Sequence, residues 1–181
     1  MQYYKNSNLK QAENASRLYA DMEFSVRQKR LSQAQTILQQ MDNDFSGSAY
    51  QIQSHLSMAK LFMDSLDYDN AITQLEFVLE QADDENFSMV ARQRIARIYI
   101  EKGDFQDALD LLGKAEFPEA FEAQFEIIKG DAYLGMGEEE NARSAYEIAL
   151  KSLSPGSFAY DFTKMKFEQI NQNNEDEDTQ T

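Results

Sequence analysis

The chain of 181 residues has no cysteine, one histidine and only two prolines. Without cysteine it can form neither disulfides nor thiolate metal sites. One histidine and no thiol leave few candidates for a nucleophile paired with a base, so no catalytic residue is expected. The scarcity of proline, together with only seven glycines, favours helices throughout the chain.

Long apolar runs and ligand-binding loops are missing as well. No run is long enough to cross a bilayer as a helix within these residues, and no glycine-rich phosphate loop occurs. Residues 67–70 begin like a calcium loop, but Ile72 and Val78 stand where such a loop needs glycine and glutamate. We therefore expect no metal and no cofactor, and interpret 67–70 as a turn and helix start. His55 is predicted to be structural or exposed rather than catalytic.

The net charge of −15 makes general nucleic-acid binding a poor interpretation. The charge is uneven: residues 1–30 hold six Lys or Arg against three Asp or Glu, a local +3, so the remainder carries −18. Two interpretations stay open. The chain is an acidic domain with a mildly basic first helix, or its basic end lies near an acidic surface such as a membrane.

A repeated pattern of small residues organises the sequence. Its anchor alanines are 37, 37 and 34 residues apart, at Ala34, Ala71, Ala108 and Ala142. The last three of these follow a small residue, an aromatic residue and a turn at constant helical spacing. The small residues are Ala59, Ala96 and Gly130, and the aromatic residues are Phe62, Tyr99 and Tyr133.

This pattern resembles the tetratricopeptide repeat. Its small residues let the two helices of a hairpin approach closely, and hairpins must stack because one alone cannot bury its apolar face. The resemblance predicts an all-α fold, a right-handed stack of about 3.5 helical hairpins with a long N-terminal helix and a C-terminal capping helix. The family's tryptophan position holds His55, Arg92 and Glu126 instead.

The predicted segments follow from this register. Residues 1–45 form an N-terminal helix (2–30) and a partial repeat (31–41). Residues 46–154 form three repeats, with helix pairs at 47–65 and 68–82, 86–102 and 105–115, and 118–136 and 138–153. Residues 155–170 form the capping helix. Residues 171–181 are polar and acidic and are predicted to be disordered.

The first helix of each hairpin supplies the candidate protein-binding groove. Transferred from the family by position, its candidate residues are Leu56, Lys60, Met63, Val90, Gln93, Arg97, Ile100, Ile127, Asp131 and Leu134. Because six of these ten residues are apolar, an extended or helical apolar partner is expected. The alternative, that the chain's own first or last helix fills the groove, stays open.

Three arginines, Arg92, Arg94 and Arg97, cluster on one predicted helix. We expect them to pair with the nearby acids at positions 83–85, contributing little to stability at a surface. The alternative is that they anchor an acidic group of a partner.

A closer resemblance covers roughly residues 10–170. Residues 86–97, 130–137, 141–147 and 165–170 are similar to the YfgM-type ancillary subunit of the bacterial Sec translocon. These are structural runs and mark family membership rather than a site.

That resemblance implies a bacterial inner-membrane protein with a single span upstream of residue 1, whose repeat domain lies on the periplasmic side. The aromatic and basic residues at 2–5 would flank the end of that span. The implied partners are translocon channel proteins and the membrane-anchored periplasmic chaperone PpiD, and the implied role is to pass secretory chains to periplasmic chaperones. The alternative is a tetratricopeptide scaffold that assembles another cytoplasmic or cell-envelope complex.

Overall fold

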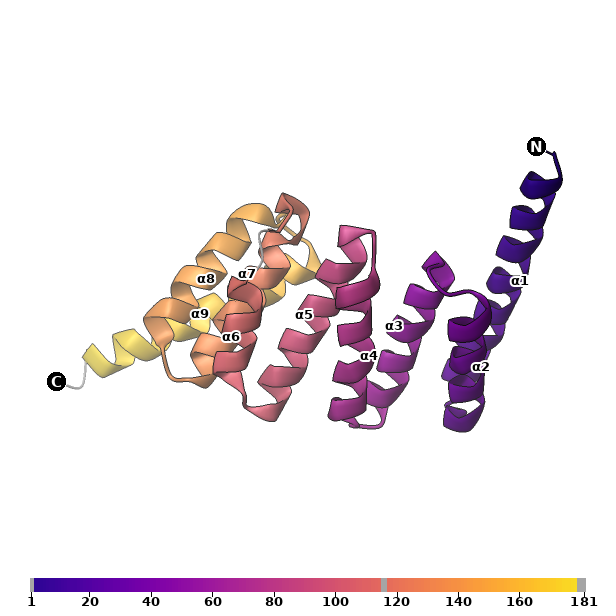
Figure 1. Cartoon of the computed structure of the whole chain (residues 1–181). Coiled ribbons are helices and arrows are strands. Elements are labelled where there is room, and N and C mark those ends of the chain that lie inside the picture. Colours follow the sequence, from indigo (N-terminus) through magenta and orange to yellow (C-terminus); the bar gives the residue numbers. More distant parts are fainter. Residues whose placement is uncertain (1, 115–116, 179–181) are drawn as a thin grey trace. The chain divides into compact units, whose positions relative to one another are not determined.

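The computed structural model describes residues 2–114 and 117–178, with side chains over 9–114 and 117–171. Within these ranges all regular structure is α-helical, from α1 to α9 (Figure 1), which confirms the predicted all-α fold. None of the described helices is long and apolar enough to cross a membrane. The chain divides into two compact units, residues 1–91 and 92–181, and each is described separately.

The first unit contains α1 (Gln2–Arg27), α2 (Leu31–Asp44), α3 (Ala49–Asp64), α4 (Tyr68–Gln81) and the start of α5 (Glu85–Lys102). Helix α1 packs against α2 and α3, and α3 packs against α4. The fully buried side chains at these contacts include Met22, Met41, Met58, Leu61 and Leu75.

The second unit contains the rest of α5, then α6 (Phe105–Gly113), α7 (Glu119–Gly135), α8 (Glu139–Ser152) and α9 (Phe158–Asp178). Helix α7 packs against α6 and α8, and α9 packs against α8. Ile170 of α9 is buried in a cluster with Ala142 and Tyr146, and Tyr133 and Phe167 pack against that cluster. Helix α9 therefore covers the last hairpin, as predicted for the capping helix.

Four helix–helix turns share one backbone geometry. Their left-handed residues are Lys29, Leu66, Gly103 and Gly137, with φ of 53°, 58°, 82° and 77°. The N–H of the next residue donates to the carbonyl five positions earlier, at 2.9, 2.9, 2.8 and 2.9 Å (Arg30 to Ser25, Asp67 to Phe62, Asp104 to Tyr99, Glu138 to Tyr133). This is the Schellman arrangement that ends a helix. The turns recur with the spacing of the anchor alanines, so α1 and α2 form the first hairpin of the series.

The small residues of the pattern occupy the closest approaches. The side chains of Ala71, Ala108 and Ala142 are completely buried. A Cβ added to Gly130 would lie 2.4 Å from the ring of Tyr146 on α8. That distance is shorter than carbon atoms can approach, so only glycine fits at this position unless the ring moves. The predicted close packing within the hairpins is confirmed.

Several helix ends differ from the predicted ones. Helix α1 ends at Arg27 instead of residue 30, because the Lys29 turn begins there, and α2 continues through Asp44 instead of ending near 41. Helix α9 continues to Asp178, where residues from 171 were predicted to be disordered. No proline or glycine interrupts it after Gly156, and Asn, Gln, Asp and Glu each cost only tenths of a kcal/mol in a helix. Residues 115–116 and 179–181 lie outside the described part of the chain.

Candidate functional site

In the first unit, the candidate groove residues lie on α3 and on the start of α5. Leu56, Lys60 and Met63 follow one another at helical spacing on α3, where Lys60 is exposed and the other two are half-buried. Val90 on α5 is also half-buried. None of the four is taken completely into the core. This face keeps apolar surface within reach of solvent.

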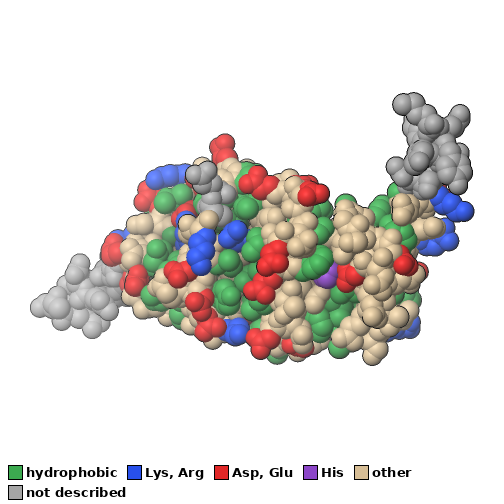
Figure 2. Space-filling view, in the orientation of Figure 1, with side chains coloured by type: hydrophobic (Ala, Val, Ile, Leu, Met, Phe, Trp, Pro, Cys, Tyr) green, Lys and Arg blue, Asp and Glu red, His purple; other side chains and the backbone are tan. Residues whose placement is uncertain are grey.

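In the second unit, the candidates lie on α5 and α7. Arg97 and Leu134 are exposed, and Leu134 keeps 40% of its surface accessible. The other four, half-buried, are Gln93, Ile100, Ile127 and Asp131. Figure 2 shows hydrophobic side chains among acidic ones over the described surface of both units.

Asp131 already has two partners within the second unit. The hydroxyl of Tyr146 donates to Asp131 Oδ1 at 2.6 Å, and Nζ of Lys166 on α9 donates to the same oxygen at 2.5 Å. Burial, and then the hydrogen bond and charge of Asp131, raise the pKa of Tyr146 well above its usual value. An external partner of Asp131 would have to compete with α9 for it.

His55 is a structural residue of the first unit. The residue is 5% exposed, and its ring stacks on Phe77 with centroids 3.7 Å apart. Nδ1 lies 2.8 Å from Gln74 Oε1, and Nε2 lies 3.0 Å from Asp42 Oδ1. Nε2 of Gln51 also donates to Asp42 Oδ1, at 2.8 Å. The histidine thus ties α2, α3 and α4 together, in agreement with the predicted structural role.

Of the three clustered arginines, Arg92 binds a backbone carbonyl and not one of the predicted acids. Nη1 of Arg92 donates to the carbonyl of Leu111 on α6 at 2.9 Å, and burial lowers the pKa of both Arg92 and Arg94. The carboxylate of Asp84 accepts from the backbone N–H and the side-chain amide of Asn86. Arg92 therefore closes its own hairpin, since a guanidinium in a tight space binds the nearest unpaired carbonyl of the helix end.

The segment that begins like a calcium loop, residues 67–70, is a helix cap. Asp67 Oδ1 accepts from the backbone N–H of Asn70 at 3.4 Å, and Oδ2 accepts from its amide at 2.8 Å. Among the described residues, no group of three or more His, Asp or Glu is arranged to hold a metal ion. The turn and helix-start interpretation is confirmed.

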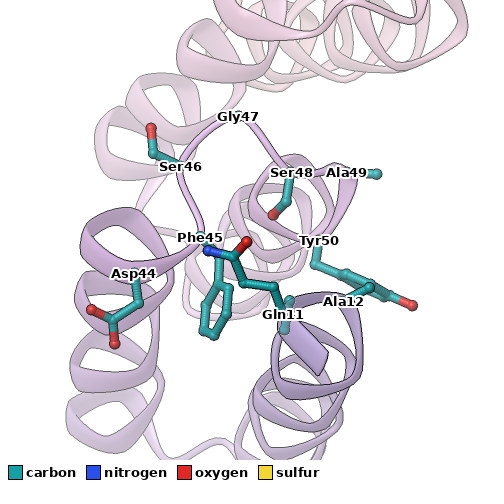
Figure 3. Close-up of a pocket in the computed structure, with 10 residues that line it drawn as sticks. Gln11, Ala12, Asp44, Phe45, Ser46, Gly47, Ser48, Ala49 and Tyr50 are labelled. Carbon is teal, nitrogen blue, oxygen red and sulfur yellow. The ribbon is translucent and has the colours of Figure 1, made fainter. Parts of the chain in front are cut away.

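Sequence reasoning missed two clefts beside the loop between α2 and α3. The larger, with a volume of about 400 Å³, lies between α1 and this loop and is shown in Figure 3. The smaller, of about 130 Å³, lies between the loop and the link from α4 to α5. The only sequence signal was the Ser-Gly-Ser stretch at 46–48. It marks a loop but does not show what surrounds it.

Comparisons with known proteins place the chain in a family. Residues 1–172 match the family described as tetratricopeptide repeat-like domain. The "Ancillary SecYEG translocon subunit" of Aggregatibacter actinomycetemcomitans is 24% identical over 147 residues, covering 81% of this chain and 71% of that protein. The proteins of the same name from Haemophilus influenzae (strain Rd) and Escherichia coli (strain K12) are 26% identical over 150 residues and 30% identical over 105 residues. These alignments cover 83% and 58% of this chain, and 72% and 50% of the relatives.

A solved structure gives the same fold. MamA (41-end) from Desulfovibrio magneticus RS-1 superposes with a TM-score of 0.67 over 91% of this chain and 88% of that one, at 18% identity. That identity supports a shared fold and nothing finer. Together with the buried small residues and the four equal turns, the match over residues 1–172 shows that this chain belongs to the family of tetratricopeptide repeat-like domains.

Proposed function

We propose that this chain is a non-enzymatic, protein-binding ancillary subunit of the Sec translocon. The observation that carries the proposal is its similarity to three ancillary SecYEG translocon subunits, two of them aligned over more than four fifths of this chain. The fold fits the role, because helical hairpin repeats present helix faces to partner proteins rather than enclosing a reaction site.

In this proposal each unit presents a binding face on the first helices of its own hairpins. Leu56 and Met63 on α3 and Ile100 on α5 are half-buried, and Leu134 on α7 is exposed. Each can lose further apolar surface to a partner, which is worth roughly 1.5–3 kcal/mol per fully buried side chain before entropic costs. Such a face suits an extended or helical apolar segment.

The finer part of the proposal concerns place and task. In it, a single N-terminal span upstream of residue 1 anchors the protein in the bacterial inner membrane, with the repeats on the periplasmic side. There it joins the translocon channel to a membrane-anchored chaperone of the PpiD type and helps to pass secretory chains on. The resemblance of the repeat segments supports this arrangement.

Crosslinking in membranes tests the proposal. A full-length, affinity-tagged protein is expressed in its source cell with a photoreactive residue at Met63 or, as a control, at Glu76, which is exposed on α4. We expect the channel proteins, or a chaperone bound to them, to crosslink from position 63 and not from position 76. If position 63 crosslinks to a different complex, and to neither the channel proteins nor a chaperone, the chain would instead be a scaffold for another assembly.

A further inference from the structure

The larger cleft of the first unit is open to solvent and is lined by apolar and polar residues together. Its volume of about 400 Å³ lies within the range of ligand pockets. The half-buried rings of Phe45 and Tyr50 border it, and Ala12 on α1 and Ala49 on α3 leave the space open because their side chains are small (Figure 3). Tyr50 is held in place against Tyr19 of α1, with ring centroids 5.8 Å apart.

The loop between α2 and α3 is fixed by its own hydrogen bonds. The N–H of Gly47 donates to Gln51 Oε1 at 2.8 Å, and the N–H of Gln51 donates to Ser48 Oγ at 3.1 Å. Gln51 is in turn bonded to Asp42, which contacts His55. The cavity wall is therefore part of the rigid frame of the unit, and little ordering is required when a ligand enters.

The smaller cleft lies on the other side of the same loop. The two clefts share Gly47, Ser48 and Ala49, and the smaller one adds the apolar side chains of Ile52 and Phe87. A Cβ placed on Gly47 would meet no atom within 4 Å, so the loop between the clefts faces open space. A chain lying across this loop could place side chains in both clefts.

The charges at the two clefts have one sign. Asp44 lines the larger cleft, and Asp83 and Asp84 line the smaller one. Among the residues whose side chains the structure describes, no lysine or arginine lines either cleft. A ligand that complements both therefore combines large apolar groups with positive charge, as a peptide does when aromatic residues alternate with basic ones.

We propose that the loop between α2 and α3 is a second binding surface, which takes an extended basic peptide segment with an aromatic side chain seated in the cleft between Phe45 and Tyr50. This surface is separate from the face formed by Leu56, Lys60 and Met63. It does not depend on the association with the translocon.

Binding of synthetic peptides to the purified chain tests this site. The probe is a fluorescent peptide of alternating Phe and Lys, and the control peptides replace Phe with Ala or Lys with Glu. We expect the Phe–Lys peptide to bind at least tenfold more tightly than either control, and its affinity to fall as salt rises, because the carboxylates lie at the surface.

Two variants locate the binding. Ala12→Phe fills the larger cleft from the exposed surface of α1, and Asp44→Lys reverses its charge; Glu76→Lys on α4 is the matched control. Each cleft variant is expected to weaken the Phe–Lys peptide about tenfold or more at an unchanged melting temperature, while Glu76→Lys changes binding less than twofold. The proposal is overturned if the three peptides bind alike, if Glu76→Lys weakens binding as much as Asp44→Lys, or if only Met63→Glu weakens it. Translocon crosslinking from position 63 is unaffected by any of these results.

Discussion

The two units build the same hairpin turn from different residues. In the first unit the left-handed positions hold Lys29 and Leu66, and in the second they hold Gly103 and Gly137. Glycine adopts this conformation freely, whereas another residue pays roughly 1–2 kcal/mol. The backbone hydrogen bonds are nevertheless the same in all four turns. The turn is thus determined by helix-end hydrogen bonding and by the buried alanine that follows, and glycine only lowers its cost.

The hairpins also differ in the residues at their close approach. At equivalent positions the α3–α4 hairpin has Ala59 and Leu75, and the α5–α6 hairpin likewise has Ala96 and Leu112. The α7–α8 hairpin of the second unit instead has Gly130 and Tyr146. A larger side chain on one helix is matched by a smaller one on the other, so the combined volume is nearly conserved. The repeat therefore constrains the pair rather than either residue.

The largest effect is expected from a charge at an anchor alanine. Ala108→Glu, and Ala71→Glu in the first unit, place an unpaired carboxylate where the side chain is now completely buried. Each variant should lose roughly several kcal/mol of unfolding free energy. Thermal denaturation measures the loss, with the exposed Gln106→Glu as control. An unchanged melting temperature for either variant would refute the register assigned to that unit.

The next largest effect tests the paired volumes. Gly130→Ala directs a methyl group into the ring of Tyr146, and this overpacking should cost roughly 1–3 kcal/mol. Gly113→Ala, where a Cβ meets nothing within 4 Å, should be neutral or slightly stabilising. A double variant, Gly130→Ala with Tyr146→Leu, reproduces the first unit's pair. Because Tyr146→Leu also loses the hydrogen bond to Asp131, the double variant is compared with both single variants, and strictly additive losses would contradict the pairing of volumes.

A pH effect on stability is expected from Tyr146 in the second unit. The pKa of Tyr146 is raised in the folded chain. Above the usual tyrosine pKa of about 10, the unfolded chain therefore releases the proton while the folded chain still holds it. The contribution of Tyr146 to the unfolding free energy is complete below that pH and is lost as the pH rises above it. Unfolding free energy should then fall by up to about 1.4 kcal/mol per pH unit from this residue. Urea denaturation between neutral and alkaline pH should show a shallower decline for Tyr146→Phe. Equal declines would mean that the tyrosine ionises as easily when folded as when unfolded.

The smallest effect concerns the turns themselves. Leu66→Gly relieves roughly 1–2 kcal/mol of strain but loses roughly 0.4–1 kcal/mol because glycine makes the unfolded chain more disordered. Because the Leu66 side chain is 72% exposed, it gives up little packing, and a net gain of about 0.5 kcal/mol is expected. Gly103→Leu should lose a similar amount. Chemical denaturation gives the unfolding free energy of both variants. If the two substitutions changed this free energy in the same direction, the comparison of the two units would be contradicted.

Much of the fold was predictable from sequence because its determinants are local and periodic. Ala71, Ala108 and Ala142 recur at repeat spacing, and each lies where the pattern places it. Lys29 was not recognised as a turn, since neither glycine nor proline marks it. The extension of α9 was missed because acidic composition was given more weight than the absence of helix breakers.

The site was less predictable because it depends on contacts between distant polar residues. The ion pair between Lys166 and Asp131, and the bonds of His55 to Asp42 and Gln74, join residues that no short pattern relates. The clefts beside Gly47 arise from the way α1 and two loops meet around it. Such features follow from tertiary packing, and the repeat period says nothing about them.

The central claim is that the first helices of the repeats bind the partner. It is tested most directly by two measurements on one double variant, Met63→Glu with Ile100→Glu, in the full-length protein. The melting temperature and the co-purification of translocon proteins are determined for the same double variant. We expect a melting temperature close to that of the unmodified protein and a loss of most of the co-purified partner, because both side chains are only half-buried in the chain itself. Normal folding with undiminished co-purification would contradict a binding face on the first helices of the repeats, and a collapse of folding would show that these residues belong to the core.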